Sequence, residues 1–136
     1  TAFWLMRRYP WWSVDSASWA KVAGYGSIYV PHKRKGKFTF EVDPYVIAFS
    51  HRSEAAKTKG KHYYTLTPGE KTVLREWLEE IDVPLGTVDS NGETIEYGVL
   101  SEYNARAIAN LRFFEVMCKW LPKWPPLKGL LDPLWI

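Results

Sequence analysis

Apolar and polar residues alternate in the first half of the chain, in the pattern typical of β-strands. Residues 37–42 place Phe38, Phe40 and Val42 on one face and polar side chains on the other. The residues before them, 31–36, contain proline and glycine and predict a turn, so this region is expected to form a hairpin with a basic tip. The segments predicted to be strands are residues 27–30, 37–42, 45–49 and 62–66.

The second half of the chain shows the three- and four-residue spacing of helices. Thr67 and Glu70 form a capping box, in which the first residue caps the helix and the second accepts a bond back from the cap. Pro68 stands at the first helical position, which tolerates proline because its N–H would have no partner there. A helix is therefore predicted from Thr67 to about Asp82.

A longer helix is predicted from about Leu100 to Pro122. It follows a small hairpin with a turn at residues 89–92, which joins short strands at 87–88 and 94–97. The residues of the long helix that are predicted to face the core are Leu100, Tyr103, Ala107, Ile108, Leu111, Phe114 and Cys118.

These elements predict an α+β fold, in which a small antiparallel sheet of three or four strands from the first half is covered by two C-terminal helices. A short helix is also predicted between Ser13 and Gly24. We expect residues 1–25 to be an aromatic-rich N-terminal extension, residues 26–119 a compact α+β domain, and residues 120–136 an extended tail rich in tryptophan and proline.

Composition adds an excess of aromatic surface and an uneven charge. Of the 136 residues 16% are aromatic and eight are tryptophan, more than a small core easily buries. Residues 1–66 carry eleven Lys or Arg against four Asp or Glu, whereas residues 67–136 carry seven against eleven. The single cysteine, Cys118, excludes an intrachain disulfide and fits a reducing or organellar interior. The longest purely apolar run is five residues, so no transmembrane span is expected.

The tryptophans near the two ends of the chain are candidate partner-binding residues. Tryptophan carries a large share of the binding energy at protein interfaces, so we favour docking onto neighbouring protein subunits. Two alternatives stay open: aromatic rings also concentrate at membrane–water interfaces, and both ends could fold back onto the chain's own core. The candidate residues are Trp4, Trp11, Trp12, Trp120, Trp124 and Trp135.

The basic hairpin tip is a candidate for contact with phosphates, either of RNA or of anionic lipid headgroups. Its candidate residues are Lys33, Arg34, Lys35 and Lys37. The alternative is a solvated charged loop that only keeps the hairpin soluble.

Catalytic patterns are poor in this sequence. The three histidines, His32, His51 and His62, lie in basic stretches expected to be loops exposed to water, at no metal-ligand spacing. A Gly24-Tyr25-Gly26 start of a dinucleotide loop lacks its third glycine and precedes a strand instead of following one. We therefore expect no enzyme activity, no cofactor and no metal site.

The hypothesis that fits these features is a non-catalytic structural accessory subunit of a large multi-subunit assembly. Its expected setting is an organellar, respiratory-type complex, with the chain peripheral to the mitochondrial inner membrane. Its expected partners are neighbouring protein subunits and, secondarily, anionic lipid headgroups. The alternative is an RNA-binding component, such as an organellar ribosomal protein, that uses the basic hairpin; nucleic acid is the less favoured partner.

Overall fold

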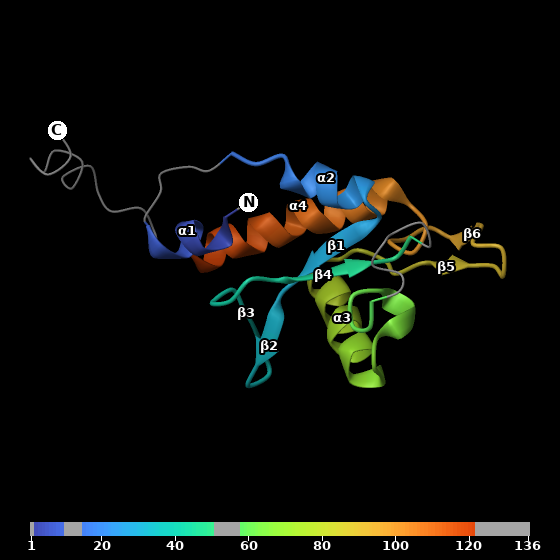
Figure 1. Ribbon diagram of the computed structural model, residues 1–136, viewed down its shortest axis with the longest axis horizontal. Helices are drawn as coiled ribbons and strands as arrows, with labels where there is room; N and C mark the ends of the chain where they lie inside the picture. The colour runs from blue at the N-terminus through green and yellow to red at the C-terminus, as the bar shows by residue number, and fades with distance from the viewer. Residues whose placement is uncertain (1, 10–14, 51–57, 122–136) are drawn as a thin grey trace, which may run out of the picture.

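A computed structural model describes residues 2–9, 15–50 and 58–121, and its architecture is α+β, as predicted. A ribbon of two antiparallel strands, β1 (Ser27–Val30) and β4 (Tyr45–Ala48), runs through the middle of the molecule. The helices α2 (Ser18–Gly24) and α4 (Tyr103–Trp120) lie on one side of this ribbon, and α3 (Pro68–Glu80) lies on the other (Figure 1).

The strands form two-stranded pairs where a three- or four-stranded sheet was predicted. Besides the central ribbon, β2 (His32–Arg34) pairs with β3 (Lys37–Thr39), and β5 (Thr87–Val88) pairs with β6 (Thr94–Glu96). Pro31 separates β1 from β2, and a proline offers no N–H to a ladder. The β2–β3 hairpin therefore leaves the central ribbon and projects beside α3 (Figure 1).

The free edge of β1 is covered by a side chain instead of a third strand. Asn110 of α4 is fully buried, and its Oδ1 accepts a hydrogen bond of 2.8 Å from the Tyr29 N–H. Its Nδ2 donates to the carbonyl of Ser27 at 3.3 Å and to the carbonyl of Trp19 in α2 at 3.0 Å. The amide thus pairs with β1 as a strand backbone would, and it joins α2, α4 and β1.

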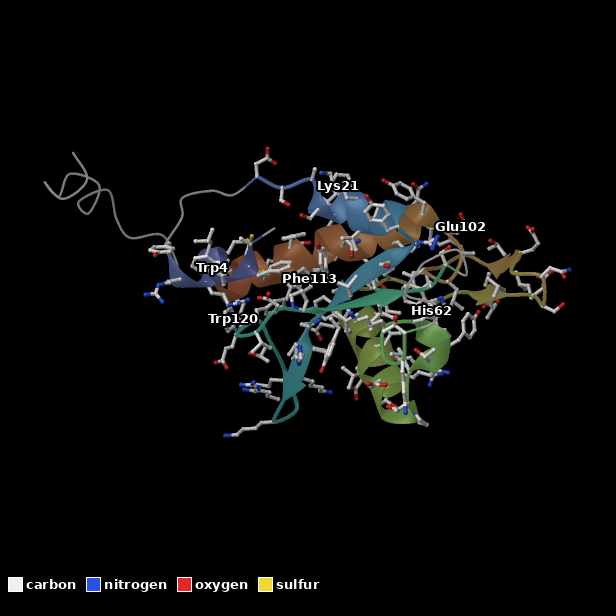
Figure 2. All side chains as sticks on the ribbon, viewed as in Figure 1. Trp4, Lys21, His62, Glu102, Phe113 and Trp120 are labelled. Carbon is white, nitrogen blue, oxygen red and sulfur yellow. The ribbon has the colours of Figure 1, made fainter. Side chains whose placement is uncertain are left out.

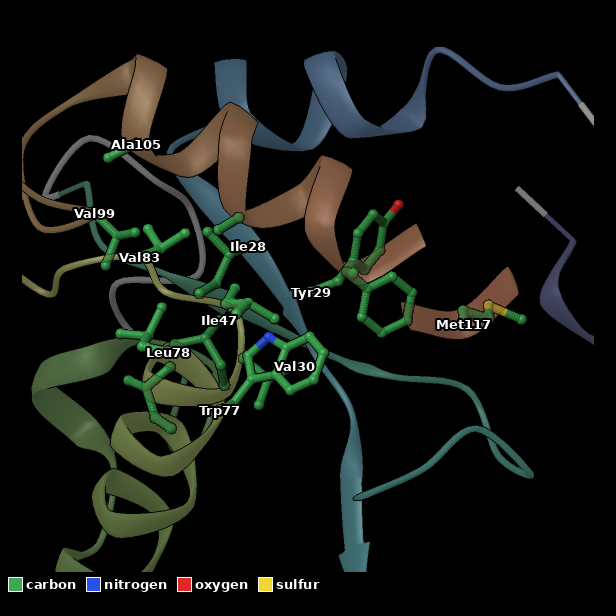
Figure 3. Close-up of a cluster of buried hydrophobic side chains, with 14 of the residues drawn as sticks. Ile28, Tyr29, Val30, Ile47, Trp77, Leu78, Val83, Val99, Ala105 and Met117 are labelled. Carbon is green, nitrogen blue, oxygen red and sulfur yellow. The ribbon is translucent and has the colours of Figure 1, made fainter. Parts of the chain in front are cut away.

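The hydrophobic core lies on both faces of the central ribbon. Ile28, Val30 and Ile47 point toward α3, where they meet Trp77 and Leu78 (Figure 3). On the other face, the ring of Tyr29 points toward α4 (Figure 3) and packs 5.3 Å from Phe113. All four residues of β1 are buried, as are Ile47 and Ala48 of β4, whereas Tyr45 and Val46 at the start of β4 are exposed. Burial on both faces explains the near-continuous apolar run of β1.

The helix α3 begins as predicted and ends slightly earlier. The Thr67 hydroxyl accepts from the Glu70 N–H at 3.3 Å, and the Glu70 carboxylate accepts from the Thr67 N–H at 2.7 Å, so the capping box is complete. These bonds hold the pKa of Glu70 below its ordinary value, because they stabilise the charged carboxylate. Asp82 adopts a left-handed φ of 52° just beyond the helix and turns the chain away.

The buried face of α4 differs from the predicted one. Four residues that were expected in the core are exposed: Tyr103, Ile108, Leu111 and Cys118. The buried face passes instead through Arg106, Asn110, Phe113 and Met117, which repeat at the three- and four-residue spacing of a helix. The helix carries apolar side chains nearly all round, and two of its buried residues are polar, so the apolar stripe was a misleading guide.

The predicted fourth strand at residues 62–66 is wrong. The chain there makes one parallel bridge, between Ala48 and His62, and then a short 3-10 helix, η2 (Tyr63–Thr65). His62 is buried, although a water-exposed loop was predicted. Its ring lies within hydrogen-bond distance of the Ser50 carbonyl, and its Nδ1 accepts from the Tyr64 N–H. The ring thus organises the backbone on both sides of it.

The N-terminal residues supply two short helices that pack on the rest of the chain. The helix α1 (Phe3–Arg8) buries Phe3 and Met6 in the core, and α2 packs against α4. The predicted helix start at Ser13 lies outside the described residues, and α2 ends at Gly24 as expected. In the part of the chain that the structure describes, no helix has the length and apolar character required for a bilayer crossing.

Two glycines bring the root of the β5–β6 hairpin into close backbone contact. A Cβ at Gly98 would lie 2.2 Å from the Gly86 nitrogen, and one at Gly86 would lie 2.7 Å from the Glu96 carbonyl oxygen. Gly86 also has a left-handed φ of 78°. Neither position can therefore carry a side chain without moving the backbone.

We expect Asn110→Ala to lower the free energy of unfolding by about 3 kcal/mol or more, because it leaves three backbone groups without their partner. Asn104→Ala, an exposed change on the same helix, is the matched control and should lie within about 0.5 kcal/mol of the wild type. Urea denaturation measures both. Equal effects of the two changes would contradict the structural role of Asn110.

We expect Thr67→Ala to cost about 1 kcal/mol through loss of the cap, whereas Thr72→Ala in the same helix should cost little. The lowered pKa of Glu70 adds stability above its unfolded-state pKa, and this stability is lost as pH falls through the folded-state pKa. Glu70→Gln should therefore flatten the acid side of the stability profile. A profile parallel to that of the wild type would argue against the linkage.

Candidate functional site

The helix α1 is fixed to the body of the protein on one face. The Phe3 ring stacks on Phe114 with centroids 5.9 Å apart, and it meets Tyr29 edge-on at 5.4 Å. On the same helix, the Arg7 guanidinium pairs with Asp43 at 2.7 Å. These contacts fix the orientation of α1, although the helix is only six residues long, and so fix the side of the helix on which Trp4 lies.

Trp4 points outward from this anchored helix and is 55% exposed (Figure 2). Trp120, the last residue of α4, is 41% exposed, and its ring lies 5.8 Å from Phe40. Phe40 in turn packs 5.3 Å from Phe113, which also lies 5.9 Å from Phe3, so one ring cluster holds α1 and contacts Trp120. Both lie at one end of the molecule (Figure 2), and we call these two residues the aromatic surface.

Four other tryptophans that the sequence suggested as partner-binding residues, Trp11, Trp12, Trp124 and Trp135, lie outside the described residues. Their partner-binding role stays a prediction.

The basic side chains of the β2–β3 hairpin differ in their surroundings: two form ion pairs, and two are exposed at the tip. The Lys33 ammonium pairs with Glu76 of α3 at 2.5 Å and lies 5.5 Å from the centre of the Phe38 ring. Arg34 pairs with Glu41 at 3.4 Å, with both side chains exposed. Two of the four candidate phosphate contacts thus already face a carboxylate, which lowers the positive potential that the hairpin offers to an anion.

Lys35 and Lys37 are exposed at the tip of the same hairpin. Lys35 and Gly36 both have left-handed φ angles, 49° and 76°, which is the geometry of a two-residue type I′ turn. This tight turn holds Lys35 away from the body of the protein. The contact of these lysines with phosphate stays a prediction.

A groove between the central ribbon and α3 was not predicted from the sequence. It has a volume of about 230 Å³, with Tyr45 and Ile47 of β4 on one side and Val73 and Leu74 of α3 on the other. The His32 ring stacks on Tyr45 at its rim, with centroids 3.9 Å apart. No periodicity in the sequence places β4 against the start of α3, so only the folded arrangement reveals this space.

The buried polar side chains serve the backbone. Besides Asn110 and His62, the guanidinium of Arg106 donates to the Ser101 carbonyl at 2.9 Å. Burial lowers the pKa of Arg106, and the nearby Glu102 carboxylate opposes this effect. Among the described residues, no group of three or more His, Cys, Asp or Glu side chains is placed to hold a metal ion.

Comparison with known proteins gives no match to a family model, to a curated protein or to a solved structure.

We expect Trp4→Ala to leave the free energy of unfolding within about 0.5 kcal/mol of the wild type, because its ring is largely in water. Phe3→Ala, one residue earlier, should cost about 3–5 kcal/mol, because it empties a buried ring site. Thermal or urea unfolding of both variants checks the contrast. A large loss for Trp4→Ala would mean that this ring supports the fold and is not available to a partner.

Proposed function

We propose that this protein is a non-catalytic accessory subunit of a multi-subunit assembly, and that it docks onto a neighbouring protein through the aromatic surface. The observation that carries the proposal is the exposure of Trp4 and Trp120 on helices that the core holds in place. An exposed tryptophan ring leaves apolar surface in contact with water, and burying that surface in an interface is favourable. Tryptophan is also enriched among the residues that dominate interface energies.

Rigid support strengthens this proposal. A side chain on a helix that is already held in place costs less conformational freedom on binding than one on a flexible segment, so more of its burial contributes to affinity. The stacking of Phe3 on Phe114 fixes α1, and the contact of Trp120 with Phe40 restrains the second ring.

The use of buried polar groups also supports a structural role. Asn110 and His62 have the side-chain chemistry that enzymes use, but each is engaged with backbone groups of the chain's own elements. In the proposal these residues maintain the fold. A respiratory-type assembly at the mitochondrial inner membrane remains the expected setting, on grounds of composition.

One observation favours the alternative, an RNA-binding component. The β2–β3 hairpin projects from the body of the protein (Figure 1). Lys35 and Lys37 are exposed on it. The ion pairs of Lys33 and Arg34 weaken this reading, because they neutralise part of the charge that would attract phosphates.

The proposal is tested with the tagged full chain expressed in its source cells and followed by native gel electrophoresis of a detergent extract. The wild type should migrate in a large complex, and the double variant Trp4→Ala, Trp120→Ala should migrate largely as the free chain. Tyr25→Ala removes an aromatic ring that is 75% exposed and belongs to neither candidate site, so it is the matched control.

The same gels separate the alternatives. Loss of incorporation with Lys35→Ala, Lys37→Ala, together with its abolition by ribonuclease, would favour the RNA-binding component. A wild-type chain that migrates alone, or a double tryptophan variant that is incorporated normally, would contradict the proposed subunit role. Cell fractionation of the wild type tests the mitochondrial setting separately.

A further inference from the structure

The central ribbon has one edge whose backbone groups point outward. The Tyr29 N–H is directed to Asn110 and so away from β4, which makes Tyr29 and its partner Val46 a non-hydrogen-bonded pair. The N–H and carbonyl of Val46 therefore point away from β1, toward the outer edge of β4. Val46 is 45% exposed there.

The chain covers only the far end of this edge. The Ala48 N–H donates to the Lys61 carbonyl at 2.9 Å, and Ala48 forms the parallel bridge with His62. Gly60, the residue before Lys61, has a left-handed φ of 77°, and the chain turns away there. Among the described residues, no backbone group continues this pairing alongside Val46.

The groove between β4 and α3 lies next to this uncovered stretch. Tyr45 and Ile47, the neighbours of Val46 on β4, line it together with Gly60, where the covering chain departs. Its volume of about 230 Å³ exceeds the roughly 150 Å³ of an apolar cavity that accepts benzene. The space is therefore large enough for one aliphatic or aromatic side chain.

The charges at the rim specify the chemistry of that side chain. Lys33 is paired with Glu76, and the Glu70 carboxylate accepts the Thr67 N–H, so both charged groups that line the groove are already engaged. The remaining lining is mainly apolar: Val30, Ile47, Leu66, Val73 and Leu74. An uncharged, apolar group fits this environment best.

We propose that β4 receives an extended segment of a partner protein, which pairs with the backbone of Val46 and inserts one apolar side chain into the groove. Added strands bind in this way, with main-chain hydrogen bonds for affinity and a side-chain pocket for specificity. Alternate residues of a strand face the same side, so a paired segment directs a side chain toward α3 as Tyr45 and Ile47 do. This site is separate from the aromatic surface and goes beyond the proposed function.

The probe is a fluorescein-labelled peptide with the sequence acetyl-Lys-Thr-Leu-Thr-Leu-Thr-Lys-amide, titrated against the full chain by fluorescence anisotropy. Val46→Pro removes the outward N–H but no bond of the ribbon, since proline is tolerated on an exposed strand edge. It should weaken binding about tenfold. Val46→Ala keeps the N–H and should bind within about threefold of the wild type, as the matched control.

Val73→Phe fills the groove from α3 and should also weaken binding about tenfold, whereas the double variant Trp4→Ala, Trp120→Ala should bind as the wild type does. N-methylation at every second residue of the peptide tests strand pairing without any change to the protein. Of two versions, one methylated at both leucines and the other at the threonines, the version whose N-methyl groups face β4 should not bind. The Val46 amide should become protected from hydrogen exchange when the peptide is bound.

Several outcomes would overturn the proposal. These are the absence of saturable binding at millimolar peptide, equal binding of Val46→Pro and Val46→Ala, or binding of both N-methylated peptides as tightly as the unmodified one. Binding that is lost only in the double tryptophan variant would place the peptide on the aromatic surface instead. That result would contradict the proposed strand-binding site but not the proposed function.

Discussion

The fold depends on the buried side-chain amide of Asn110. A buried amide is costly unless its donors and acceptor are paired, and here one amide satisfies backbone groups of β1 and α2. This pairing closes the edge of β1 and sets the position of α4 along it. Trp120 lies ten residues further along the same helix, about 15 Å away, so the interaction that orders the core also positions part of the aromatic surface.

Local signals predicted much of the fold. The α+β class was predicted correctly, because strand alternation and helix spacing fall in different halves of the chain. The capping box of Thr67 and Glu70 gave the start of α3 to the residue, since a cap depends only on neighbours in sequence. The turn at residues 89–92 likewise located the β5–β6 hairpin. At the candidate site, composition pointed to the tryptophans near the ends, but only the structure separates the buried Phe3 from the exposed Trp4.

The rest depends on contacts between distant residues. The buried face of α4 contains Asn110 because β1 and α2 need its amide, and apolar periodicity cannot anticipate such a need. The exposed Ile108 and Leu111 then made the wrong face appear to be the core side. His62 was predicted to be exposed to water for a similar reason. The sequence around it does not show that its ring lies against the carbonyl of Ser50, twelve residues earlier. The groove beside β4 could not be predicted at all, since it is the space left between two elements.

The bare backbone contact of Gly86 with Gly98 has a practical consequence for anyone who wishes to label this molecule. It clamps the β5–β6 hairpin at its base without any side chain, and the strands beyond carry little of the core. Asn91 and Gly92 at the tip of the hairpin are exposed. An epitope or fluorophore inserted at that loop should travel with the protein while leaving its helices, and both candidate docking surfaces, undisturbed.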